Sequence, residues 1–207
     1  MPPAAPENEA PTSAKRAAIQ AAVLEATEAL LSEGATFADL GIERIATRAG
    51  ISRTAFYFYF KDKRELLVRL TEEVNALLFE QADIWFSGDG DPAADLREAL
   101  QNISALYDEH AVLLRAIVEV ATYDDDVALL WRTTLGRFVD ATERRIESER
   151  ERGRAVCEHA PETAFALTWM TERALYQQLV QTDPLPQANV VAALADIWAR
   201  AVYGTAG

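Results

Sequence analysis

The stretch GISRTAFYFYFKDKRELL, residues 50–67, contains five consecutive aromatic residues followed at once by basic ones. Ser52 can cap a short helix over this run, and Gly50 before it suits a tight turn. On such a helix Phe56 and Phe60 lie four residues apart, so they share a face that can pack in a core. The stretch therefore predicts a short helix that follows a glycine turn and is anchored by aromatic side chains.

The residues just before this turn predict another short helix. Two short helices joined by a tight turn are typical of a helix-turn-helix, whose second helix enters the major groove of DNA. On that second helix Arg53, Thr54 and Tyr57 share a face separate from the aromatic anchor. Arg53 can contact guanine, Thr54 a base edge and Tyr57 a phosphate. Tyr59 and Lys63, at the end of this helix and the start of the next, are suited to contact the DNA backbone.

The alternative is that these aromatic residues only fill the core of a small helical subdomain. We expect this role for Phe56 and Phe60, but it does not account for the tyrosines between them or for the local charge. The chain has a formal net charge of -13, whereas residues 44–64 hold six basic side chains and one acidic one. A local excess of positive charge is what a small nucleic-acid footprint requires.

Composition narrows the classes of protein that remain. The 207 residues, half of them hydrophobic, can form one large domain or two small ones. The chain lacks a long uncharged apolar run, and its start lacks the features of a signal peptide, so we expect no membrane partner and a cytoplasmic location. The overall negative charge argues against general adhesion to nucleic acid. The single cysteine, Cys157, excludes an internal disulfide.

Apolar residues recur at helical spacing through most of the chain, and sustained strand alternation is absent from the sequence. We expect an all-α protein of about nine helices. The first is expected from about Ser13 to Glu33, and a long one after Asp62. Beyond a loop rich in glycine and aspartate, the expected helices are 94–107, 111–120, 127–152, 161–180 and 187–203.

With these motifs in place, residues 13–64 resemble the DNA-binding domain of TetR family transcriptional regulators. The core of the likeness is TFADLGIERIATRAGISRTAFYFYFKDKRELL, which contains the pattern G-[IV]-S-x-x-x-[FL]-Y-x-[YH]-F-x-x-K-x-x-L. The resemblance implies that Thr36 or Phe37 meets phosphate at the N-terminus of the second helix. Ala55 departs from the family, where many members carry threonine. The implied DNA contacts are Thr47, Ser52, Arg53, Thr54, Tyr57, Tyr59 and Lys63.

Three helical stripes in the rest of the chain can face one another around a cavity. Together they are apolar with a few hydroxyl groups, which is the usual composition of a small-molecule site. A solid core, with the threonines bonded to their own helices, is equally compatible with the pattern. The stripes are Trp131, Leu135, Phe138 and Thr142; Leu100, Ile103 and Tyr107; and Thr168, Thr171 and Leu175.

The stretches TWMTERALY, IWARAVYG, LWRTTLGRF and IESERERG resemble the EthR-like branch of the family. Members of this branch are repressors with a long, mostly apolar ligand tunnel in each subunit. Thr168 and Thr171 replace the characteristic asparagines of the branch, and Phe138 replaces a tryptophan, so the identity of the ligand does not carry over. The implied tunnel positions are Trp131, Phe138, Thr142, Thr168, Thr171, Tyr176 and Trp198.

The resemblance also implies a homodimer that forms through the last two helices. A two-fold dimer would offer two recognition helices to two half-sites of DNA. The alternative is that the same residues pack only within one subunit. The face concerned contains Val190, Ala193, Leu194, Ile197 and Ala201.

An enzyme is the competing class. The run of three aspartates that starts at Asp124 lacks the further acid that a metal-binding motif needs, because position 128 is alanine. It is better interpreted as a helix cap. Cys157 and His159 lie in an expected loop, and His110 is expected near the start of a helix. A phosphate-binding glycine loop is also absent from the sequence. We therefore predict no catalytic residue, metal or cofactor.

These patterns together predict a ligand-responsive repressor. We expect it to bind a palindromic double-stranded operator as a homodimer, and to be released by a small, mostly apolar effector. The alternatives are an all-helical enzyme, or a small-molecule-binding protein without a role in DNA regulation. The expected divisions are a disordered arm over 1–12, a helix-turn-helix domain over 13–61, and a ligand-binding and dimerisation domain over 62–207.

Overall fold

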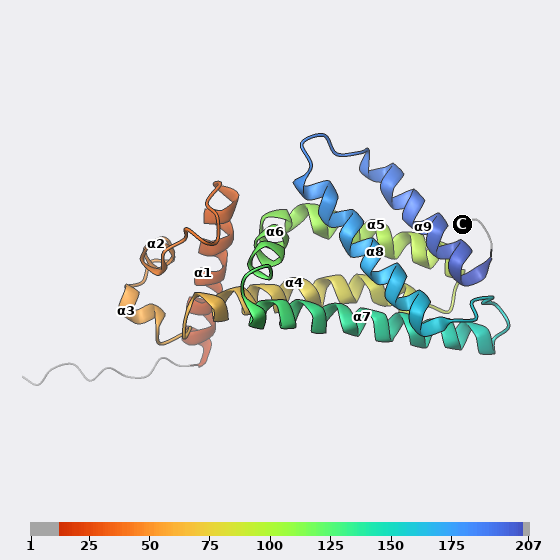
Figure 1. The fold of residues 1–207 in the computed structure, drawn as a ribbon. Coiled ribbons are helices and arrows are strands. Elements are labelled where there is room, and N and C mark those ends of the chain that lie inside the picture. The colour runs from red at the N-terminus through yellow and green to blue at the C-terminus, as the bar shows by residue number, and fades with distance from the viewer. Residues whose placement is uncertain (1–12, 205–207) are drawn as a thin grey trace, which may run out of the picture. The chain divides into compact units, whose positions relative to one another are not determined.

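A computed structural model describes residues 13–204. Within this range the chain forms nine α-helices and no strand (Figure 1), which confirms the expected all-α fold. The arm expected over residues 1–12 lies outside the described residues. The helices are α1 (Ser13–Ser32), α2 (Ile42–Arg48), α3 (Arg53–Phe56), α4 (Lys63–Phe86), α5 (Pro92–Glu109), α6 (Ala111–Val120), α7 (Asp125–Glu151), α8 (Ala160–Val180) and α9 (Gln187–Tyr203).

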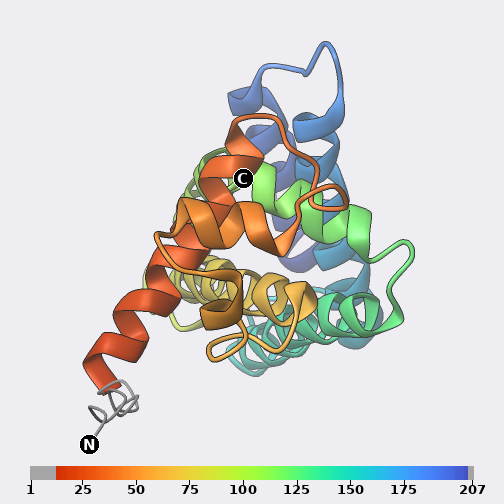
Figure 2. The same ribbon diagram turned by 90° about the vertical axis from the view of Figure 1, so that its left-hand side faces the viewer.

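The chain divides into two compact units after Leu66. We call the described residues up to Leu66 the first unit and those from Leu67 the second unit. In the first unit α2 packs against both α1 and α3 (Figures 1 and 2). Val23 of α1, Ile45 of α2 and Phe56 of α3 are fully buried. These side chains form an apolar core, and α2 and α3, with 7 and 4 residues, are too short to be stable without it.

The turn between α2 and α3 depends on a glycine. Gly50 has φ +73°, a left-handed conformation that costs other residues free energy. The amide of Ile51 donates to the carbonyl of Ala46 at 3.0 Å, which closes α2 as in a Schellman motif. The hydroxyl of Ser52 then accepts from the amide of Ala55 at 3.1 Å. The predicted glycine turn and serine cap are confirmed.

In the second unit α4 and α7 run side by side in the same direction (Figure 1). Successive turns of α4 contact successive turns of α7. Asn75 Nδ2 donates to Thr134 Oγ1 at 3.3 Å, and further along the ring centroids of Phe79 and Phe138 lie 5.1 Å apart. Around this pair, α8 packs along α7, α5 packs along α9, and α6 contacts α5, α7 and α8.

Aspartates cap three of these helices. Asp62 accepts from the amide of Glu65 at 2.8 Å at the start of α4, and Asp91 accepts from the amide of Ala93 at 3.1 Å at the start of α5. Asp124 accepts from the amides of residues 126 and 127 at 3.1 and 3.2 Å. The capping interpretation of the aspartate run is therefore confirmed, and such caps satisfy amides that lack helical partners.

A buried ion pair closes the far end of α7. Glu149 is fully buried, and its Oε1 accepts from Arg154 Nη2 at 2.6 Å. Arg145 Nη2 lies 3.3 Å from the same oxygen, and the Arg145 guanidinium stacks 5.8 Å from the ring centroid of Trp85. Arg152 Nη1 lies 3.5 Å from that oxygen as well, so the fold supplies this carboxylate with three cations.

Among the helices of residues 13–204, none is both long enough and apolar enough to cross a membrane.

Candidate nucleic-acid interface and internal cavity

Helix α3 separates its anchoring residues from its exposed ones. Phe56 and Phe60 are 0 % and 1 % exposed, which confirms the predicted anchor. Arg53, Thr54 and Tyr57 are exposed to solvent on the same helix or its C-terminal cap. The buried rings fix the orientation of α3, so its exposed side chains are presented on a rigid support.

Arg53 is available for an external partner. Its guanidinium lies 3.8 Å from the carboxylate of Glu43, and both side chains are more than half exposed. An exposed ion pair of this length contributes little free energy. A phosphate or a guanine edge can therefore replace Glu43 at small cost.

The predicted contact at Thr36 or Phe37 is placed differently from the expectation. The second helix begins at Ile42, so both residues precede it by five residues or more instead of forming its N-terminus. Thr36 Oγ1 donates to Asp39 Oδ2 at 2.7 Å, and the carbonyl of Thr36 accepts from the amide of Leu40. These bonds form a separate turn, and the ring of Phe37 is buried within it.

Lys63 is engaged inside the first unit. Its ammonium donates to the carbonyl of Phe37 at 2.7 Å and to that of Ala38 at 3.0 Å. It also lies 4.9 Å from the centroid of the Phe37 ring, and burial lowers the pKa of Lys63. An ammonium has three N–H donors, so one remains for a phosphate. Sequence reasoning missed this holding role, because its partners are 25 and 26 residues away.

The remaining predicted contacts differ in exposure. Thr47 and Ser52 are exposed, whereas Tyr59 is only 9 % exposed. The Arg16 guanidinium lies 5.6 Å from the centroid of the Tyr59 ring. Arg48 forms a 2.6 Å ion pair with Glu33, and this hydrogen bond lowers the pKa of Glu33. Some of the local positive charge is therefore used to join α1 to α2.

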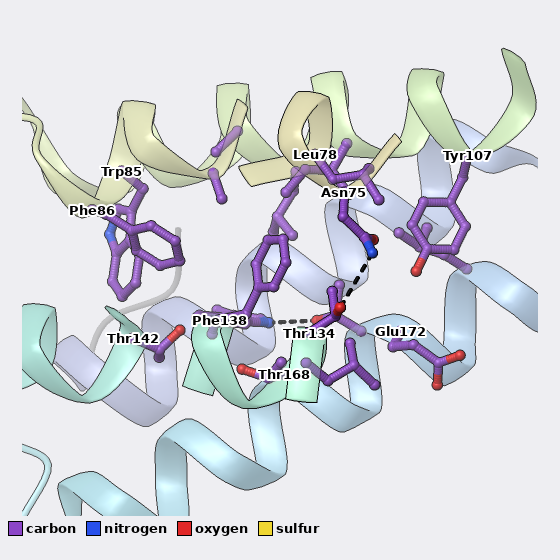
Figure 3. Close-up of a pocket in the computed structure, with 18 of the residues that line it drawn as sticks. Asn75, Leu78, Trp85, Phe86, Tyr107, Thr134, Phe138, Thr142, Thr168 and Glu172 are labelled. Atoms are coloured by element: carbon purple, nitrogen blue, oxygen red, sulfur yellow. Dashed lines mark hydrogen bonds between the residues drawn. The ribbon is translucent and has the colours of Figure 1, made fainter. Parts of the chain in front are cut away.

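The second unit contains a mostly apolar cavity between α4, α5, α7, α8 and α9 (Figure 3). The cavity volume is about 80 Å³, which is room for several waters or one slender organic molecule. Tyr176, although predicted with this set, does not line the cavity, and its ring faces Arg173 at 5.1 Å. The predicted residues that do line it are Leu100, Ile103, Tyr107, Trp131, Leu135, Phe138, Thr142, Thr168, Thr171, Leu175 and Trp198.

Sequence reasoning missed the contribution of α4 and one charged residue. Helical periodicity marked α4 as amphipathic but could not show which helices it faces. Glu172 follows Thr171 on the predicted α8 stripe, since positions 168, 171, 172 and 175 share one helical face, but glutamate is usually exposed. The missed lining residues are Asn75, Leu78, Ala82, Trp85, Phe86, Leu96, Ala99, Thr134 and Glu172.

Polar groups in the cavity wall fall into paired and unpaired sets. Trp198 Nε1 donates to Thr171 Oγ1 at 2.8 Å, and Asn75 donates to Thr134. Among the described residues, the hydroxyls of Thr142 and Thr168 and both carboxyl oxygens of Glu172 have no hydrogen-bond partner. Buried polar atoms are normally satisfied, so these groups are candidate contacts for a bound molecule.

The two ends of the cavity differ in chemistry. Figure 3 shows Tyr107 and Glu172 at one end, and Trp85 and Phe86 at the other. Burial raises the pKa of Tyr107, and the charge of Glu172 adds to this shift. Burial also raises the pKa of Glu172, and Arg173 opposes the shift. The described residues contain no cluster of three or more His, Cys, Asp or Glu that could hold a metal ion. This geometry suits binding of a small molecule.

The family model for bacterial regulatory proteins of the tetR family matches residues 23–70, and that for the C-terminal domain of the transcriptional regulator EthR matches residues 96–204. The chain therefore belongs to the TetR family and has an EthR-type C-terminal domain. It is a helix-turn-helix transcriptional regulator, not an enzyme. Regulators of this family bind operator DNA and small-molecule effectors.

Individual relatives agree with this assignment. The chain is 32% identical over 191 residues to the HTH-type transcriptional regulator EthR of Mycobacterium tuberculosis, covering 88% of this chain and 86% of that protein. It is also 32% identical over 198 residues to EthR of Mycolicibacterium smegmatis, covering 90% and 87%. SmeT, the repressor of the Stenotrophomonas maltophilia multidrug efflux pump SmeDEF, shares the fold in its triclosan complex. That match has a TM-score of 0.73 and 23% identity, and covers 90% of this chain and 92% of SmeT.

Proposed function

We propose that this chain is a ligand-responsive repressor that binds a palindromic operator as a homodimer and leaves it when a small, mostly apolar molecule occupies the cavity. The observation that carries the proposal is the presence of two sites in one chain. The α3 face holds exposed residues suited to DNA, and the second unit encloses an apolar cavity with unpaired polar groups. We also propose a cytoplasmic location, which a DNA-binding role supports.

The proposed dimer uses α8 and α9. Phe165 of α8 is 57 % exposed and Ile197 of α9 is 45 % exposed, and exposed apolar side chains on neighbouring helices favour a protein interface. Leu194, predicted for the same face, is buried within its own subunit. A two-fold dimer would present two α3 helices to two half-sites.

Helix α4 is the proposed route of coupling. It starts in the first unit with Lys63, whose ammonium holds the turn at residues 37 and 38. It continues into the second unit, where Asn75 and Trp85 line the cavity. A ligand that binds one position of α4 more tightly than another would shift the population of conformers. The solved triclosan complex of SmeT supports an effector site in this fold.

The test measures binding of the full chain to the double-stranded DNA upstream of its own gene, by fluorescence anisotropy. Arg53→Ala should weaken binding by about tenfold or more and relax its sequence preference. Arg132→Ala, an exposed change on α7, is the matched control and should bind like the wild type. Equal binding by both variants would refute the assigned face, and a wild type without sequence preference would favour a ligand-binding protein without DNA regulation.

A further inference from the structure

Glu172 is a buried carboxylate that the fold leaves without a hydrogen bond. It lies on α8, is 3 % exposed and lines the cavity. Among the described residues, neither of its oxygens has a hydrogen-bond partner. Arg173 Nε lies 3.7 Å from Oε2, beyond hydrogen-bond distance, on a side chain that is half exposed. A carboxylate in this position is costly unless something pairs with it.

Glu149 is also a buried glutamate, but its carboxylate is paired with arginines of the same chain. Glu149 is equally buried, but its Oε1 accepts from Arg154 at 2.6 Å and lies 3.3 Å from Arg145, and only its Oε2 has no hydrogen-bond partner among the described residues. The pairing cations of Glu149 belong to the protein itself. For Glu172 the nearest cation is Arg173, 3.7 Å away, and the carboxylate borders the cavity, so a bound molecule can supply the hydrogen bonds that it lacks.

The surroundings of Glu172 indicate the shape of that molecule. Tyr107 lies at the same end of the cavity (Figure 3), and its ring can stabilise a cation through its face. Burial keeps the Tyr107 hydroxyl protonated, since its pKa is raised. The opposite end holds Trp85 and Phe86, which offer mainly aromatic surface, and the hydroxyl of Thr142. The Trp85 indole donates to Tyr203 at 3.1 Å.

We propose that the cavity selects molecules that carry a protonated amine on an apolar, slender body, with the ammonium bound to Glu172 beside Tyr107 and the body directed toward Trp85 and Phe86. This inference rests on the proposed function, because it names the chemical class of the effector. An ammonium donates the hydrogen bonds that the carboxylate lacks. Charge-assisted bonds of this kind are strong where water is excluded.

The competing possibility is a neutral Glu172 that donates to a carbonyl or ether of an uncharged ligand. Burial raises the pKa of Glu172, which favours the acid form relative to an exposed glutamate. An ammonium would favour the ionised form, whereas an uncharged ligand would favour the acid. The two cases predict opposite preferences between an amine and an alcohol of the same shape.

The experiment compares phenylbutylamine with phenylbutanol by isothermal titration calorimetry on the full chain at neutral pH. The amine should bind the wild type about tenfold or more tightly than the alcohol, as expected for hydrogen bonds to a charged group. Glu172→Gln should lose that preference while its affinity for the alcohol stays unchanged. Glu162→Gln, an exposed change on the same helix, should retain the preference. Circular dichroism establishes that both variants are folded.

Several results would overturn the inference. Equal affinity of the wild type for the two probes would overturn it without any variant. So would an amine preference that persists in Glu172→Gln, or a wild type that binds neither probe.

Release of operator DNA is measured separately, so that the two proposals can fail independently. Amine binding through Glu172 without DNA release would support the inference and refute ligand-responsive repression. DNA release by the alcohol as readily as by the amine would refute the inference and keep the proposed function.

Discussion

The first unit keeps most of its candidate contact residues on the surface, whereas the second unit keeps them inside. Arg53 and Tyr57 are exposed next to a buried Phe56, so a short segment of sequence specifies this part of the site. The cavity takes its walls from five helices, between Asn75 of α4 and Trp198 of α9. A surface site can therefore be built from local structure, while an internal site depends on the packing of distant segments.

The largest expected effect concerns the internal charges of the second unit. Glu149→Ala leaves Arg145 buried without its carboxylate and should lower the free energy of unfolding by about 3–5 kcal/mol. Urea unfolding followed by circular dichroism measures the change. Glu147→Ala, exposed on the same helix, should change it by less than about 0.5 kcal/mol. Similar losses in both variants would show that the buried pair is not what stabilises this end of α7.

A smaller loss is expected in the first unit from Lys63→Met. The change removes two bonds from the ammonium to the carbonyls of Phe37 and Ala38, and should destabilise the first unit by about 1.5–3 kcal/mol. DNA binding should weaken alike on all sequences, while affinity for a cavity ligand stays the same. Hydrogen exchange of the amides around residues 36–40 reports the local loosening. Unchanged exchange there would contradict the holding role of Lys63.

Substitution of alanine for a glycine should lower the free energy of unfolding at one position in the first unit and raise it at one position in the second unit. Gly50→Ala forces alanine into φ +73° with no atom within 4 Å of the new Cβ, so strain alone should cost about 1–2 kcal/mol. Gly136 lies inside α7, where a new Cβ also has no atom within 4 Å. Gly136→Ala should therefore raise the free energy of unfolding by up to about 1 kcal/mol. Thermal unfolding measures both. A gain at Gly50 would mean that the turn does not require the left-handed conformation.

The smallest expected effect is a dependence of stability on pH at Glu172. Its pKa is raised in the folded state, so the folded protein holds this proton more tightly than the unfolded chain does. The contribution of Glu172 to stability should therefore fall as pH rises from the unfolded pKa through the folded pKa. Tyr107 and Arg173 are the ionisable neighbours that act on it or respond to it.

Urea unfolding of the wild type and of Glu172→Gln across this pH window tests whether the contribution of Glu172 to stability falls as pH rises. The stability of the variant relative to the wild type should rise with pH, because glutamine has no proton to lose. A difference in stability that stays constant with pH would show that burial does not raise the pKa of Glu172.

The helix-turn-helix could be predicted from sequence because its determinants are local. The glycine turn, the Ser52 cap and the pair Phe56 and Phe60 all lie within eleven consecutive residues, and each follows from short-range geometry. The stripes of the cavity were predicted for the same reason, since periodicity fixes the face of a single helix. What periodicity cannot fix is the neighbour that a face will meet.

The residues that sequence reasoning missed or misplaced are those with distant partners. Lys63 reaches carbonyls that lie 25 and 26 residues earlier, and Asn75 reaches Thr134 across 59 residues. Glu172 shares a stripe with apolar neighbours, yet charge usually marks an exposed position. Tyr176 was assigned by resemblance to a tunnel that it does not reach in this structure. In each case long-range packing decided the outcome.

The distribution of tryptophan gives the chain an intrinsic optical reporter. All four tryptophans lie beyond residue 66, and Trp85, Trp131 and Trp198 line the cavity. Indole emission therefore arises entirely from the second unit and should change in intensity or wavelength when a molecule enters. Occupancy of the cavity can thus be titrated without a label while DNA is bound, because DNA contributes almost no emission in that range.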